Sequence, residues 1–180
     1  ELWNAENINL VNNCHAEKLD RNRRVVTDTE GNEYPYDVLI FATGSRAVRI
    51  PILNSDVAHV FRTVDDVKNM VSEVNRLQST LGRAPRGIVV GGGLLGLEAA
   101  EGLKELGAEP TILDVTPWLL SVEVDQGGGY AVNAQIKATG IDIETGVFIS
   151  GINKDADGNV VSVSIADSPS EDANIRTLPA

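Results

Sequence analysis

The segment from Gly87 to Glu98, GIVVGGGLLGLE, places three glycines where a protein could hold a phosphate group. Apolar β-forming residues come directly before Gly91, and an apolar stretch with helical spacing begins at Leu94. A strand, a turn spaced Gly-x-Gly-x-x-Gly and a helix, in this order, are typical of a dinucleotide-binding site. Because no Gly-Lys-Ser/Thr sequence follows, the pattern does not indicate a nucleoside-triphosphate P-loop.

Each glycine of the turn has a separate expected role. Gly91 lets the chain turn sharply out of the strand, Gly93 lets the backbone approach a pyrophosphate, and Gly96 lets the helix pack closely on the sheet. The first turn of the helix offers free N–H groups and the positive end of the helix dipole. We therefore expect the backbone amides of Leu94 and Leu95 to donate hydrogen bonds to the pyrophosphate.

An acidic residue is expected about twenty residues after such a turn, where it binds the hydroxyls of the adenosine ribose. Asp114 stands at this distance from Gly96, at the end of the apolar run Pro110 to Leu113. A solvated acid at a strand end is the alternative for Asp114. Residues 115–117 contain no Arg or Lys that could bind a 2′-phosphate, so the sequence favours NADH, with NADPH as the alternative.

Three helices are expected to position or support these residues. The first covers Val64 to Leu81, the second Leu94 to Leu106, and the third Asp125 to Thr139. Because glycine is a poor helix former, the run at 127–129 predicts a frayed or disordered start to the third helix. Glu98, on the second helix, is expected either to lie beside the nicotinamide or to be a first-turn acid favoured by the helix dipole.

Short β-forming segments surround these helices. The run from Asp37 to Ala42 is continuously apolar after its first residue, which predicts a strand covered on both faces. Residues 155–159, DADGN, are interpreted as a hairpin turn rather than a calcium loop, because flanking helices and an acid at the twelfth position are missing. The other expected strands are 8–11, 16–19, 24–27, 33–36, 88–90, 110–113 and 141–145, followed by an antiparallel meander at 147–153, 160–166 and 175–178.

The composition excludes several classes of function. The chain has 180 residues, a net charge of −11 and a pI of about 4.5, so it is not expected to bind nucleic acid, which requires a basic face. It contains no apolar run of about 18 residues that would indicate a membrane span. We expect no secretory signal, because no charged and then apolar segment opens the sequence. The single cysteine, Cys14, allows no internal disulfide and is consistent with a cytoplasmic location. No catalytic Cys14–His15 pair and no metal site with His59 are expected.

Beyond these motifs, YPYDVLIFATGS and GIVVGGGLLGLEAAEGLKELG together resemble a known family, the pyridine nucleotide-dependent flavoprotein reductases with two dinucleotide-binding domains. The resemblance covers nearly the whole chain. Within the family, the sequence GGGLLGLEAA is most similar to the large subunit of assimilatory NAD(P)H nitrite reductases, followed by NADH:rubredoxin and ferredoxin reductases. The expected fold class is therefore α/β: a Rossmann-like NAD(P)-binding domain with a parallel sheet, helices and a small meander, joined to part of an FAD-binding domain.

The resemblance also implies a division of the chain and a reaction. Residues 1–84 are expected to be a partial FAD-binding domain, and residues 85–180 a truncated NAD(P)H-binding domain. Ala42, Thr43 and Gly44 match the family's Ala-Thr-Gly turn and are expected to lie near the flavin. The rest of the FAD domain is expected in the missing remainder of a longer parent, in which NADH would pass hydride to FAD. The isolated piece is predicted to be inactive, with the cofactors rather than any side chain carrying the chemistry.

Two other interpretations stay open on the sequence alone. One is a non-catalytic module in which NADH occupancy changes a contact with a partner. The other, within the enzyme class, is a reductase with rubredoxin or ferredoxin as the electron acceptor. A homodimer that uses exposed strand edges is also considered.

Overall fold

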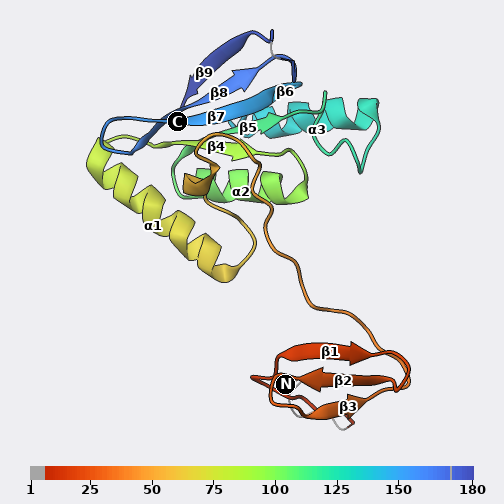
Figure 1. Cartoon of the computed structure of the whole chain (residues 1–180). Coiled ribbons are helices and arrows are strands. Elements are labelled where there is room, and N and C mark those ends of the chain that lie inside the picture. Colours follow the sequence, from red (N-terminus) through yellow and green to blue (C-terminus); the bar gives the residue numbers. More distant parts are fainter. Residues whose placement is uncertain (1–6, 171) are drawn as a thin grey trace. The chain divides into compact units, whose positions relative to one another are not determined.

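The computed structural model describes residues 7–170 and 172–180, and these residues form two compact units, Glu1–Ser45 and Arg46–Ala180 (Figure 1). The first six residues of the expected FAD-domain part lie outside the described residues. The division between the units precedes the expected domain boundary at 84 and 85, so the long first helix belongs to the same compact unit as the glycine turn. The assignment of the two parts to two cofactors stays a prediction.

The first unit contains a three-stranded antiparallel sheet in the order β1-β2-β3. Three of the expected strands are therefore confirmed. Their bounds are β1 Ala16–Asp20, β2 Val25–Asp28 and β3 Glu33–Pro35.

Asp28 closes the turn between β2 and β3. Only 4% of its surface is exposed, yet its carboxylate accepts hydrogen bonds from the N–H groups of Glu30 and Asn32, from the Asn32 side-chain amide and from the Tyr34 hydroxyl. The Asn32 side chain is the largest cause that holds the pKa of the Asp28 carboxyl well below its ordinary value. The buried charge is therefore compensated by donors that also fix the turn.

The prediction of two further strands in this unit is wrong. Neither 8–11 nor 37–42 is a strand in the structure, and both segments are mostly exposed. In the second segment the side chains of Val38 and Ile40 are each 80% exposed, and that of Phe41 is 72% exposed. A strand covered on both faces needs neighbouring strands and covering layers. No described strand pairs with 37–42, and most of its apolar residues stay exposed.

The second unit combines three helices with six strands in two sheets. The strands β4, β5 and β6 form a parallel sheet in that order, and β7, β8 and β9 form an antiparallel sheet. A short 3₁₀ helix, η2, covers Ser55–Val57. The other bounds are α1 Val64–Leu81, β4 Arg86–Val90, α2 Leu94–Glu105, β5 Glu109–Asp114, α3 Gln126–Ala138, β6 Asp142–Thr145, β7 Phe148–Lys154, β8 Val160–Ala166 and β9 Ile175–Pro179.

Successive side chains of β4 and β5 point to opposite faces of the parallel sheet, so this unit has an apolar cluster on each face. Val89 and Ile112 belong to a cluster with residues of α2 and α3, whereas their neighbours Ile88 and Leu113 belong to a cluster with the β7-β8-β9 meander. The parallel sheet thus lies between a helical layer and the meander, as Figure 1 shows. This arrangement confirms the α/β class with its parallel sheet, helices and small meander.

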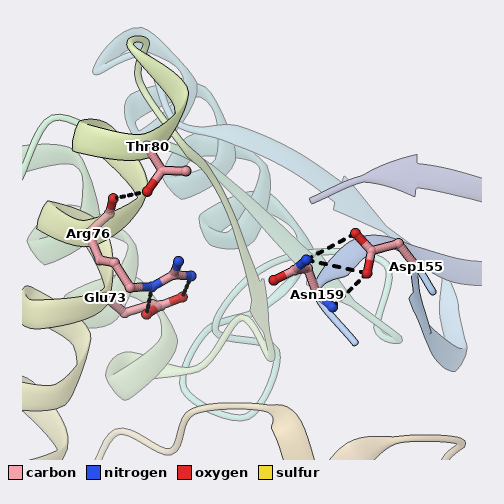
Figure 2. Close-up of polar contacts among 5 residues, drawn as sticks. All are labelled: Glu73, Arg76, Thr80, Asp155 and Asn159. Carbon is pink, nitrogen blue, oxygen red and sulfur yellow. Dashed lines mark hydrogen bonds and ion pairs between the residues drawn. The ribbon is translucent and has the colours of Figure 1, made fainter. Parts of the chain in front are cut away.

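The helix α1 covers Val64–Leu81, as the sequence predicted, and both of its ends are capped. The hydroxyl of Thr63 accepts from the N–H of Asp66, and the Asp66 carboxylate accepts from the N–H of Thr63, a reciprocal cap of the first turn. At the other end, Gly82 adopts a left-handed conformation with a φ of 64°, which ends the helix. The last turns of the helix contain the Glu73–Arg76 ion pair and a bond from the Thr80 hydroxyl to the Arg76 carbonyl, both drawn in Figure 2.

The DADGN segment is a hairpin turn, as predicted. The Asp155 carboxylate accepts from the N–H groups of Asp157 and Asn159, and Figure 2 shows its contacts with the Asn159 side chain. The Asn159 amide is the main cause of a lowered pKa of the Asp155 carboxyl. These internal bonds join β7 to β8 and account for the aspartate and asparagine of the segment.

The prediction of a frayed or disordered start for α3 is wrong. Two contacts offset the low helix propensity of its glycines. The helix begins at Gln126, directly after Asp125, whose carboxylate accepts from the N–H of Gly128 at 2.9 Å. Gly129 is buried against Trp118, and a Cβ at this glycine would lie 2.0 Å from the indole ring. The glycine run therefore lets an aromatic side chain pack directly on the helix backbone.

We expect Gly129→Ala to destabilise the protein by about 2 kcal/mol, because the new methyl group overlaps the Trp118 ring. Gly127→Ala is the matched control: its Cβ would meet only the Asp125 carboxylate at 3.6 Å, an ordinary contact. Alanine there should raise stability by about 0.5 kcal/mol through helix propensity. Urea unfolding followed by tryptophan fluorescence measures both changes, and equal effects of the two substitutions would contradict the packing role of Gly129.

Candidate functional site

The glycine turn between β4 and α2 has the conformation that the sequence predicted. Gly91 has a φ of 108°, a region that residues with side chains rarely adopt, and its N–H donates to the Leu113 carbonyl of β5 at 2.8 Å. The turn therefore starts at the carboxyl end of the parallel sheet, which is where ligands bind in α/β folds.

Gly93 and Gly96 differ in what a side chain would meet. A Cβ at Gly96 would lie 1.9 Å from the carbonyl oxygen of Gly91, so only glycine allows α2 to start this close to the turn. A Cβ at Gly93 would meet nothing within 4 Å. Gly96 is thus required by the fold, as predicted, whereas Gly93 leaves open space in front of the helix. The structure alone gives Gly93 no packing role.

The N-terminus of α2 is open to a ligand. Gly93 is its N-cap and supplies no side-chain hydrogen bond to the first turn. The first two helical residues, Leu94 and Leu95, are 58% and 47% exposed. Their backbone N–H groups are among those that have no acceptor within a helix. An anion placed here would find free donors and the positive end of the helix dipole.

Gly92, which the sequence analysis did not single out, is fixed by residues that follow β5. Its carbonyl accepts from the N–H of Leu120 at 2.9 Å, and a Cβ at Gly92 would lie 2.3 Å from the fully buried Leu119. The loop at 115–124 therefore supports the turn from one side. Sequence reasoning missed this contact, because no local pattern connects Leu119 to the glycines.

Asp114 lies at the end of β5 and contacts the turn directly. Its Oδ2 accepts from the N–H of Gly92, and its Oδ1 accepts from both the N–H and the hydroxyl of Thr116, at 2.7 and 2.6 Å. The side chain is half-buried. The acid that the sequence assigned to the adenosine ribose is therefore adjacent to the predicted pyrophosphate site rather than isolated in solvent.

Other predicted site residues are less closely connected to the turn. Glu98 is exposed on α2, and the first turn of this helix contains no acid, so the alternative of a first-turn acid is wrong. Its role beside the nicotinamide stays a prediction. Ala42, Thr43 and Gly44 are exposed and belong to the other compact unit, so the described residues around them do not enclose a flavin.

A strand, an open glycine turn, a helix and a terminal acid in contact with the turn are the geometry that the dinucleotide fingerprint requires. A model of the pyridine nucleotide-disulphide oxidoreductase family matches residues 3–175. The chain belongs to this family.

Members of the family with similar sequences include two kinds of reductase. The NADH nitrite reductase large subunit of Escherichia coli strain K12 is 39% identical over 146 residues, which are 80% of this chain and 16% of that protein. The rubredoxin-NAD(+) reductase of Ectopseudomonas oleovorans is 30% identical over 161 residues, which are 88% of this chain and 40% of that protein. The chain thus spans less than half the length of either relative.

The family fold is also found among solved structures. A ferredoxin reductase from Rhodopseudomonas palustris superposes with a TM-score of 0.68 at 25% identity, over 92% of this chain and 38% of that one. Among residues 7–170 and 172–180, no helix has the length and apolar character needed to cross a membrane. The same residues contain no cluster of three or more His, Cys, Asp and Glu side chains that could hold a metal ion.

Proposed function

We propose that this chain supplies the NADH-binding part, together with a segment of the FAD-binding part, of an FAD-dependent NAD(P)H oxidoreductase. The observation that carries the proposal is the open space at Gly93 in front of an uncapped helix, with the Asp114 carboxylate beside it. A pyrophosphate needs close backbone approach and free N–H donors, and the adjacent ribose needs an acceptor. The residues of the second unit therefore fit NADH.

Each part of the site has one task in this proposal. The amides of Leu94 and Leu95 bind the pyrophosphate, Asp114 accepts from the adenosine ribose, and Glu98 orients the nicotinamide ring. Bound NADH supplies a hydride, which the flavin of the whole protein would receive. The chain binds the coenzyme and orients it for hydride transfer, and this positioning lowers the barrier of the reaction that the cofactors carry out. Ala42, Thr43 and Gly44 would contact the flavin only when the rest of that domain surrounds them.

The overall reaction that we propose is nitrite reduction, because the relative from Escherichia coli is a nitrite reductase large subunit. Electron transfer to rubredoxin or ferredoxin is the second candidate, favoured by the relative from Ectopseudomonas oleovorans. A non-catalytic NADH-sensing module is a third. We also propose a cytoplasmic location, consistent with the single cysteine, and association as a homodimer through exposed edges.

Titration of the purified chain with NADH, NADPH and FAD tests the binding assignment. We expect micromolar affinity for NADH, weaker binding of NADPH because the Asp114 carboxylate repels a 2′-phosphate, and no tight binding of FAD. Asp114→Ala should weaken NADH binding about tenfold and bring the affinities for NADH and NADPH closer together. Tight FAD binding would contradict the division into cofactor parts, and preferential binding of NADPH would contradict the role of Asp114.

A further inference from the structure

Both oxygens of the Asp114 carboxylate are engaged within the protein before any ligand arrives. Thr116 supplies two of the three donors, its N–H at 2.7 Å and its hydroxyl at 2.6 Å, and both reach Oδ1. Gly92 supplies the third donor, which reaches Oδ2. A carboxylate has about four lone-pair positions, two on each oxygen. Oδ1 is therefore saturated, and one position stays free on Oδ2.

Thr116 is well placed to fix the carboxylate. Its hydroxyl also lies 2.8 Å from the Trp118 carbonyl, but a hydroxyl carries one hydrogen and can donate to only one acceptor at a time. The shorter contact is with the charged oxygen, so donation to Asp114 is favoured. The backbone of Thr116 is itself held, because its carbonyl accepts from the N–H of Gly146 at 2.8 Å.

We propose that Thr116 is a positioning residue that locks the Asp114 side chain, so that the free lone pair of Oδ2 alone receives the 2′-hydroxyl of the adenosine ribose. The inference rests on the proposed NADH site and adds a residue to it. Without the hydroxyl, the backbone N–H at 116 still reaches Oδ1. The carboxylate then loses one of its three fixing bonds and rotates more readily about its Cβ–Cγ bond, although the N–H groups of Thr116 and Gly92 still reach it. Affinity for the ribose falls because the acceptor must be reordered on binding.

The test compares Thr116→Val, which removes the hydroxyl at nearly constant volume, with Thr116→Ser, which keeps it. NADH and 2′-deoxy-NADH, which lacks the adenosine 2′-hydroxyl, are titrated into the 180-residue chain. We expect valine to raise the Kd for NADH about three- to fivefold, less than removal of the carboxylate in Asp114→Ala does, and serine to change it less than about twofold. For 2′-deoxy-NADH, the valine variant and the wild type should bind alike, because the ligand has no hydroxyl for Oδ2.

Thr80→Val serves as the control, since this threonine also donates through its hydroxyl but lies on α1, outside the site. It should leave both affinities unchanged. A valine effect of equal size on both ligands would indicate a merely structural role and overturn the inference. If Asp114→Ala weakens NADH binding and Thr116→Val does not, only the inference about Thr116 fails. If the wild-type chain binds no NADH, the proposed function fails.

Discussion

Replacing Gly93 by valine is expected to abolish detectable NADH binding, with a rise in Kd of about 100-fold or more, while the fold is retained. A Cβ at this position meets no protein atom within 4 Å, and the backbone has a φ of −79° and a ψ of −178°, which valine adopts without strain. The side chain would therefore occupy only the space in front of α2. That space is where the pyrophosphate is proposed to bind.

Isothermal titration with NADH measures the loss, and far-UV circular dichroism checks that the fold is kept. Gly93→Ala provides a graded control, because a single methyl group should weaken binding less than the valine side chain does. Unchanged affinity in the valine variant, with an intact fold, would contradict the assignment of the glycine turn to the coenzyme. Loss of the fold would contradict the conclusion that Gly93 has no packing role.

Gly96→Ala is expected to have the opposite phenotype, a large loss of stability of about 3 kcal/mol. The Cβ would lie 1.9 Å from the Gly91 carbonyl oxygen, which belongs to the backbone of the turn and cannot rotate away as a flexible side chain would. Relief of this overlap requires α2 to move away from β4. Because interiors are closely packed, such a shift is costly.

Gly102→Ala is the matched control for this experiment. It lies on the same helix, and its Cβ would meet only the terminal carbon of Met70 at 3.5 Å, an ordinary contact. Urea unfolding should therefore show a gain of up to about 1 kcal/mol for Gly102→Ala and a clear loss for Gly96→Ala. Similar midpoints for the two variants would contradict the close approach of helix and turn.

The glycine turn could be predicted from the sequence because its determinants are local. Gly91 needs an unusual φ, and Gly96 makes room for the carbonyl of that same glycine. Strand, turn and helix follow one another without interruption, so the pattern contains most of the information. The meander could be predicted for the same reason, since its first turn is closed by Asp155 and Asn159 within five residues of chain.

The sequence pattern failed where a partner strand is absent or where side-chain contacts outweigh intrinsic propensity. The apolar residues at 37–42 satisfy the pattern of a buried strand, but a strand forms only against a partner, and no described strand pairs with them. Low helix propensity alone predicts a frayed start of α3, whereas the Asp125 cap and the Trp118 contact stabilise it. The support that Leu119 gives to Gly92 has no counterpart in any sequence motif.

The two apolar clusters on either side of the β4-β5-β6 sheet are built entirely from residues after Arg46. Gly93 and Asp114 lie within this same self-contained body, whereas the Ala42-Thr43-Gly44 turn does not. The residues proposed to bind the coenzyme thus belong to one compact unit that could be inherited without the other. Longer proteins that reduce different acceptors could therefore contain the same unit, and the chain is similar to relatives named for nitrite and for rubredoxin.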